Sequence, residues 1–165
     1  MGYRRKTWQE KLVDKEGYPK TLMLEEGFPC YNALHKMGAD AGDEVVLVNP
    51  SEIVDLMRLV PFGRVITLKE ICQRIAEDHQ VKACCTLTSG IHVMTAANAS
   101  VEAAQDGKGL GIPYWRTLKI DGHLNDKYPG GVDEQRRLLE GEGHIIVGKG
   151  KSPRVKDFEM SLLKL

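Results

Sequence analysis

Residues 112–143 constrain the fold most strongly, because their turn and helix signals follow one another in a fixed order. The segment opens with a proline turn, Ile-Pro-Tyr-Trp-Arg-Thr, and continues into a glycine-marked loop and a Gly-Gly break. The stretch that follows ends in Glu-Gly and predicts a helix over 132–140. Extended pieces are expected at 112–120 and 144–147. The order predicts a region of short elements joined by tight turns.

Two helix starts upstream carry clear capping signals. Asn49 is a favourable N-cap, Pro50 suits the first helical position, and Pro61 ends the helix that they begin. Thr67 and Glu70 form the pattern of a capping box at the start of the next helix. In both segments apolar residues recur three and four positions apart, so each helix is expected to bury one face.

A short strand and a region of small residues surround these helices. The apolar run at 44–48 predicts the strand. Residues 83–104 are rich in small side chains, which predicts a helix beginning near Ala83, an interruption at Gly90 and a second helical stretch from Val93. The order helix, helix, turn, helix and then short strands is typical of a winged helix-turn-helix module. The sequence therefore predicts an α+β fold that is mainly helical.

The chain has 165 residues, enough for one domain with a modest core. Residues 1–43 are polar and broken by glycine and proline, and Thr7 with Glu10 predicts a short helix there. This region is expected to be an N-terminal extension packed on the domain, because it lacks a core of its own. Residues 44–148 are then the domain, and residues 149–165 are a basic C-terminal tail.

Four motifs occur together between residues 49 and 147. They are Val60-Pro61-Phe62-Gly63-Arg64-Val65-Ile66-Thr67, Ile112-Pro113-Tyr114-Trp115-Arg116-Thr117, Tyr128-Pro129-Gly130-Gly131 and Glu140-Gly141-Glu142-Gly143. In combination they resemble the DNA-binding domain of the alkylguanine-DNA alkyltransferases and of their cysteine-less alkyltransferase-like relatives. The resemblance implies a helix-turn-helix whose second helix enters the minor groove of DNA, where a target nucleotide is pushed out of the stack.

In that family the proline turn reads Pro-Cys-His-Arg, and the cysteine takes the alkyl group. Here Tyr114 stands at the cysteine position and Trp115 at the histidine position, while Glu142 matches the glutamate that orients the histidine. Alkyl transfer needs a thiolate and a base, and a phenol with a pKa of about 10 beside an indole supplies neither. The resemblance therefore implies no catalytic residue. It implies instead an alkyl-recognising pocket formed by Pro113, Tyr114, Trp115, Arg116 and Glu142.

An alternative for these residues stays open. Tyr114 and Trp115 can be ordinary core side chains with satisfied polar tips. Arg116 can equally be a structural clamp on a turn.

By the same resemblance, the residues expected at DNA lie around the turn and the start of the second helix: Thr67, Lys82, Cys85, Thr86, Thr88, Ser89 and Gly90. Small side chains there let a helix backbone approach the sugar-phosphate wall, and they equally let two helices pack tightly. The family has an arginine where this chain has Cys85 and a tyrosine where it has Leu68. Both side chains that extrude a base are therefore absent, and a thiol does not replace a guanidinium.

The net charge is zero, which argues against a strongly basic nucleic-acid binder, although both ends of the chain are basic and can add phosphate contacts. Four cysteines without disulfide or metal spacing indicate free thiols, and a cytoplasmic location is expected. No apolar run approaches the length of about 18 residues that a membrane span needs. The five histidines lack metal-ligand spacing, so neither a metal nor a cofactor is expected.

The leading hypothesis is a non-catalytic, alkyltransferase-like DNA-binding protein that recognises alkylated guanine for DNA repair. Its expected partners are double-stranded DNA and a repair protein. One alternative is an active methylated-DNA–protein-cysteine methyltransferase that uses another cysteine, Cys84 or Cys85. Another is a module that reuses the fold to bind a protein or a small ligand, which the zero net charge and the missing arginine favour.

Overall fold

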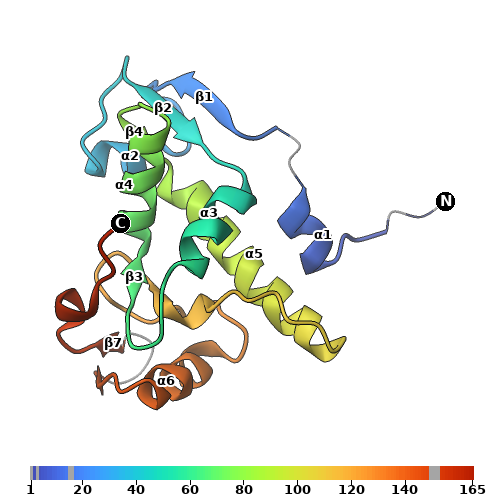
Figure 1. The fold of residues 1–165 in the computed structure, drawn as a ribbon. Helices are drawn as coiled ribbons and strands as arrows, with labels where there is room; N and C mark the ends of the chain where they lie inside the picture. The colour runs from blue at the N-terminus through green and yellow to red at the C-terminus, as the bar shows by residue number, and fades with distance from the viewer. Residues whose placement is uncertain (1, 3, 15–16, 149–152) are drawn as a thin grey trace.

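The computed structural model describes residues 2, 4–14, 17–148 and 153–165, and it is a mainly helical α+β fold with short strands (Figure 1). The helices are α1 (Trp8–Val13), α2 (Tyr31–Lys36), α3 (Pro50–Arg58), α4 (Leu68–Asp78), α5 (Thr86–Gln105) and α6 (Gly131–Gly141), with two 3-10 turns, η1 (Tyr114–Arg116) and η2 (Phe158–Ser161). The strands are β1 (Lys20–Met23), β2 (Glu44–Leu47), β3 (Ile66–Thr67), β4 (Ala83–Cys84), β5 (Thr117–Leu118), β6 (Ile146–Val147) and β7 (Arg154–Val155). Helices α1, α3 and α4 all pack on α5, the long helix that crosses the molecule (Figure 1).

The strands of the described residues form three small sheets. In the first sheet β1 runs antiparallel to β2, and β2 runs parallel to β4. In the second, β3 pairs in parallel with β5, and in the third β6 and β7 are antiparallel. Because β2 leads directly into α3 and β4 leads directly into α5, the first sheet fixes where both helices begin.

The predicted helix starts at Asn49 and Thr67 are confirmed. The Asn49 side chain accepts a hydrogen bond from Ser51 N at 3.0 Å, and Pro50 is the first residue of α3. At the start of α4, Thr67 N donates to the Glu70 carboxylate at 3.0 Å, as in a capping box. Most of each predicted apolar face is buried: Ile53 and Met57 in α3, and Ile71, Cys72 and Ile75 in α4. Leu56 and Leu68 are only partly buried.

The prediction for residues 83–104 is wrong in two respects. Ala83 and Cys84 form strand β4 instead of the first turn of a helix, because burial in the sheet outweighs the helical preference of alanine. Gly90 does not interrupt α5, which runs unbroken for 20 residues. Packing on three neighbouring helices offsets the cost of the internal glycine. Neither α5 nor another helix of the described ranges has the apolar length that a membrane crossing requires.

The N-terminal extension shares its core with the rest of the fold. Strand β1 adds to the first sheet, and the chain then turns through α2 and back to β2. Leu24, Leu34 and Ala39 of the extension are buried in one cluster with Val45 and Ala83. The extension is therefore held by apolar burial as well as by strand pairing.

Helix α1 docks separately, on the second half of α5. Its capping box at Thr7 is present, as the sequence predicts. The Glu102 carboxylate of α5 accepts hydrogen bonds from Trp8 N at 3.1 Å and from Gln9 N at 3.2 Å. A negative charge at the N-terminus of a helix is favourable, so this contact anchors α1.

The described part of the C-terminal segment is packed on the domain instead of forming a free tail. Val155 of β7 is buried, and β7 pairs with β6. Val65 N donates to Ser161 O at 3.0 Å, and Leu163 N donates to Val65 O at 2.8 Å. The predicted basic tail thus contributes to the core from residue 153 onward, because its apolar residues find partners there. Residues 149–152 lie outside the described residues.

Candidate functional site

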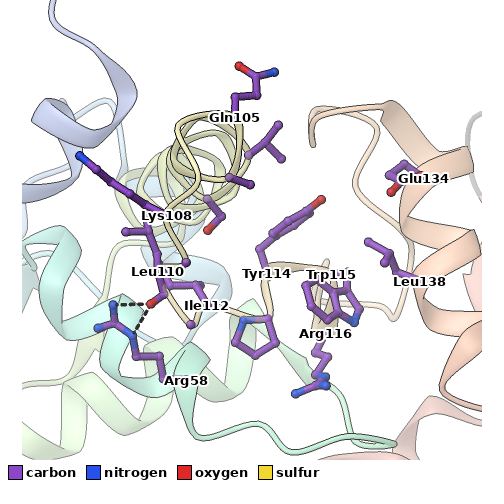
Figure 2. Close-up of a pocket in the computed structure, with 16 residues that line it drawn as sticks. Arg58, Gln105, Lys108, Leu110, Ile112, Tyr114, Trp115, Arg116, Glu134 and Leu138 are labelled. Atoms are coloured by element: carbon purple, nitrogen blue, oxygen red, sulfur yellow. Dashed lines mark hydrogen bonds between the residues drawn. The ribbon is translucent and has the colours of Figure 1, made fainter.

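Tyr114 lies at the base of a cavity, on the proline turn (Figure 2). It begins η1 directly after the buried Pro113 and is 7% exposed. Its ring meets Trp115 edge to face, with 5.4 Å between centroids and 85° between planes, and meets Tyr128 at 5.4 Å and 87°. These contacts fix the ring, and its hydroxyl points into the space between α5 and α6 (Figure 2). The turn also means that the expected extended piece at 112–120 is extended only in part.

The cavity has a volume of about 760 Å³ and opens between the second half of α5, the loop 106–113, η1 and α6. Its walls are mainly apolar and include Val101 and Leu138. An adjoining hollow of about 530 Å³ shares Val101 and Tyr114 with it and reaches toward Pro129. A concave, mostly apolar site with a few polar groups is the usual form of a ligand pocket. We call the two hollows together the Tyr114 pocket.

Two arginines at the rim of the Tyr114 pocket are already engaged. Arg58 donates from Nε and Nη2 to Leu110 O at 3.3 and 3.0 Å (Figure 2). Arg137 donates to both carboxylate oxygens of Glu134, at 2.9 and 2.6 Å, and holds the pKa of that carboxyl below its usual value. Lys108 and Asp133 also line the pocket and are exposed, so it is the mainly apolar walls that favour a neutral ligand.

A single carboxylate braces the turn from behind. Glu142 follows the last turn of α6, and its side chain is 5% exposed. It accepts hydrogen bonds from Gly63 N at 2.9 Å, from Trp115 Nε1 at 2.5 Å and from Arg116 Nε at 2.9 Å. Arg116 also donates from Nη1 to Val60 O at 2.8 Å. Burial acts to raise the pKa of Glu142, but these donors outweigh it, and the pKa lies below the usual value.

The side chains next to Tyr114 give its hydroxyl no route by which to pass a proton to Glu142. The Trp115 indole donates to Glu142 but has no acceptor nitrogen, so it cannot take a proton from its neighbour. Burial and the nearby Glu134 carboxylate raise the pKa of Tyr114. The phenol consequently stays protonated at neutral pH, where a phenol is a weak nucleophile.

The thiols lie elsewhere. Cys72, Cys84 and Cys85 are each 0% exposed, and the partly exposed Cys30 precedes α2, far along the chain from the turn. No cysteine lines the Tyr114 pocket in the part of the chain that the structure describes. Cys84 packs instead against Ser89, with 3.4 Å between Sγ and Oγ.

The residues predicted to contact DNA divide into an accessible and a buried group. The accessible group is Lys82, Thr86, Thr88 and Gly90. The buried group is Thr67, Cys85 and Ser89, each 0% exposed. The side chains of the second group face the core. The capping box holds Thr67, apolar packing with Val45 and Ala83 holds Cys85, and the contact with Cys84 holds Ser89.

Two apolar side chains occupy the exposed face at the start of α5. Leu87 is 54% exposed and Ile91, one turn later, is 58% exposed. The sequence analysis missed them, although their spacing of four residues places them on one side of the helix. No lysine or arginine occurs from Thr86 to Gln105, so α5 itself has no cation to offer to a phosphate.

The two predicted sets of site residues lie toward opposite ends of α5. The Tyr114 pocket meets the helix at Ser100, Val101, Ala104 and Gln105. Gly90 is the last residue of the predicted DNA set. At about 1.5 Å of rise per residue, Gly90 and Val101 are about 16 Å apart along the helix axis.

Two buried polar side chains behind the pocket were also missed. Gln135 of α6 accepts from Asn125 N at 2.7 Å and donates to Trp115 O at 3.0 Å. Tyr128 donates from its hydroxyl to Thr117 O at 2.9 Å. The Tyr-Pro-Gly-Gly motif signals Tyr128, but nothing in the sequence separates Gln135 from the exposed polar residues of the same helix. Among the residues that the structure describes, no three His, Cys, Asp or Glu side chains gather so that they could hold a metal ion.

The fold resembles that of a solved protein in complex with DNA. The S. pombe protein Atl1, in complex with damaged DNA containing O6-carboxymethylguanine, aligns with a TM-score of 0.50 and 16% identity over 70% of this chain and 94% of that chain. The chain has the fold of Atl1. The S. pombe ATL protein in complex with DNA aligns at 17% identity with a TM-score of 0.49, over the same shares. No protein-family model and no curated protein matches the chain. At 16% identity, the likeness to Atl1 concerns the fold.

Proposed function

We propose that this chain is a DNA-binding protein that recognises alkylated guanine in the Tyr114 pocket and transfers no alkyl group. The observation that carries the proposal is the place of Tyr114 in a chain with the Atl1 fold. Tyr114 stands on the proline turn, at the base of a cavity and in front of the Glu142 brace. The alkyltransferases that the sequence resembles have their reactive cysteine at this position.

The form of the pocket supports a base as its ligand. A volume of about 760 Å³ with apolar walls can enclose an extruded base, and aromatic side chains stand at its floor. Stacking of a base on an aromatic ring contributes roughly 1–3 kcal/mol. Atl1 was solved with DNA that contains an alkylated guanine, which supports the same class of ligand here.

The groups that are present support recognition without transfer. Cys84 and Cys85, the two candidate nucleophiles, are 0% exposed and lie away from the pocket lining. Tyr114 has a raised pKa and an indole as its neighbour. A protein of this kind binds the alkylated base, and a partner repair protein then removes the lesion.

Anisotropy titration with two labelled duplexes tests the proposal, one with O6-methylguanine and one with guanine at the same position. At low salt we expect binding of the modified duplex to be about tenfold tighter, which corresponds to about 1.4 kcal/mol. Tyr114→Ala is expected to abolish that ratio, whereas the matched variant Tyr31→Ala, in α2, keeps it. Intact-mass measurement after incubation is expected to show no added methyl group. Equal, negligible binding of both duplexes contradicts DNA recognition, and an added methyl mass contradicts the absence of transfer.

One observation favours a second candidate, a module that binds a protein or small ligand without DNA. The exposed side of α5 carries Leu87 and Ile91 but no cation. The salt dependence of duplex binding separates the two candidates. A steep loss of affinity with rising salt is the signature of phosphate contacts and contradicts the second candidate.

A further inference from the structure

A second groove lies at the start of α5, where the N-terminal extension meets α4 and α5. Its volume is about 950 Å³, and residues of α2, α4 and the first turn of α5 line it. Figure 1 shows α2 on the same side of the molecule as β4 and α4. We call it the α2 groove.

The charge of the α2 groove is one-sided. Lys36 enters its lining from α2 and Lys69 from α4, and both lysines are exposed. No aspartate or glutamate is part of this lining, and neither lysine makes an ion pair within the described residues. Two unpaired cations from two different elements therefore face one hollow, and an anionic partner complements them.

Beside apolar residues such as Met37 and Ile120, the neutral part of the lining contains groups that fit an anion. Thr86 and Leu87 form the first turn of α5 on this groove, and the side chain of the N-cap residue Cys85 makes no capping hydrogen bond. The first backbone N–H groups of a helix have no partner within the helix, and they favour negative charge. Asn32 and Gln73 add neutral side-chain donors.

We propose that the α2 groove holds the phosphate backbone of bound DNA, with Lys36 and Lys69 as phosphate contacts. This inference rests on the proposed function and extends it, because it makes the N-terminal extension part of the DNA interface. It also explains how α5, which has no lysine or arginine, can bind DNA, because the lysines belong to the neighbouring helices α2 and α4.

The position of the groove determines which property of binding it controls. Thr86 and Val101 are about 22 Å apart along α5, at about 1.5 Å per residue. Contacts in the α2 groove therefore lie away from the base in the Tyr114 pocket. They add affinity for any duplex and leave the preference for a modified base unchanged.

The test is the salt dependence of binding to the guanine and O6-methylguanine duplexes. The slope of log affinity against log salt is negative. Lys36→Gln and Lys69→Gln are each expected to make it shallower by about 0.9, and the double variant by about twice that. The ratio between the two duplexes is expected to stay as in the wild type. Lys36→Arg is expected to restore the slope, and Lys156→Gln, an exposed lysine of the C-terminal segment, is expected to leave it unchanged.

The outcomes separate this inference from the proposed function. If the wild type prefers the modified duplex but Lys36→Gln has the same slope as Lys156→Gln, only the role of the α2 groove is overturned. A change of the ratio with an unchanged slope overturns it as well, because it places Lys36 at the lesion. If the wild type binds neither duplex at low salt, both proposals fail together. Thermal unfolding of each variant, expected to match the wild type, shows that the fold is intact.

Discussion

The two ends of α5 are built in different ways. Beside its second half, the pocket floor (Tyr114, Trp115 and Arg116 with Glu142) is held by edge-to-face aromatic contacts and by hydrogen bonds to one buried carboxylate. Beside its first turn, the exposed face presents Leu87 and Ile91, which are more than half exposed. One end is specified by buried polar contacts, and the other end exposes two apolar side chains to solvent.

The two ends of α5 are therefore expected to tolerate different substitutions. At the pocket floor, an exchange must leave the partners of the carboxylate satisfied, since an orphaned buried polar group costs about 1–3 kcal/mol. The indole of Trp115 meets this demand, because it donates to Glu142 at 2.5 Å. At the α5 start, exchanges away from special features change stability by at most about 0.5 kcal/mol.

The largest effect is expected from removing the brace. Glu142→Ala leaves the Arg116 guanidinium without its carboxylate, in a site where the two side chains are 15% and 5% exposed. Loss of one partner of a buried pair costs about 3–5 kcal/mol of the free energy of unfolding. Urea unfolding at pH 7 measures it, and Glu140→Ala, exposed on the same helix, is the matched control with an effect of at most about 0.5 kcal/mol. If Glu142→Ala and Glu140→Ala lost the same free energy of unfolding, the buried carboxylate would contribute no more to stability than an exposed one.

The contribution of the Glu142 carboxylate to stability is also expected to depend on pH. The pKa of Glu142 is lower in the folded chain than the reference value of about 4.3. The ionised form therefore stabilises the fold above that value, and this stabilisation is lost as pH falls through the folded pKa. We expect the difference between the wild type and Glu142→Ala to be full at pH 7 and to shrink below about pH 4.

Much of the fold can be predicted because its signals are local. The N-cap at Asn49 and the capping box at Thr67 lie in a few consecutive residues, and both helices begin where these signals place them. The strand at Ala83 could not be predicted, because its partner Val45 is distant in sequence and pairing with it overrides local preference. The burial of Cys85 and Ser89 has the same origin, since the first sheet sets the start of α5 and with it the side that faces inward.

A smaller effect is expected from two tyrosines that touch each other. Tyr128, behind the pocket floor, donates its hydroxyl to Thr117 O at 2.9 Å, whereas no hydrogen bond of the Tyr114 hydroxyl is found among the described residues. Tyr128→Phe is expected to lower the free energy of unfolding by about 0.5–1.5 kcal/mol, and Tyr114→Phe to leave it unchanged. Chemical denaturation of both variants checks this. A matching loss in Tyr114→Phe would show that its hydroxyl is a structural group and not one that faces a ligand.

The sequence identifies several residues of the candidate site but not their positions relative to one another. The proline turn and the Glu-Gly motif identify Trp115, Arg116 and Glu142, and the structure joins all three by hydrogen bonds. The sequence does not show that Gln135 is buried behind the turn, because one polar residue in a polar helix carries no local mark of burial. Nor does it show how far the pocket lies from the start of α5, which depends on the length of that helix.

The smallest effect is expected at Gly90, and it tests why small residues occur at the start of α5. Gly90 lies inside the helix without a positive φ, and an added Cβ would stand 3.7 Å from Leu68 Cδ2, an ordinary contact. Gly90→Ala is therefore expected to raise the free energy of unfolding by about 0.5–1 kcal/mol, whereas Gly107→Ala, at a φ of +73°, is expected to lower it. If the backbone here approaches the wall of a DNA groove, Gly90→Ala weakens duplex binding while the protein becomes more stable. Stabilisation with unchanged duplex binding would instead assign the small residues to helix packing, and would leave the α2 groove and the Tyr114 pocket as the sites of DNA contact.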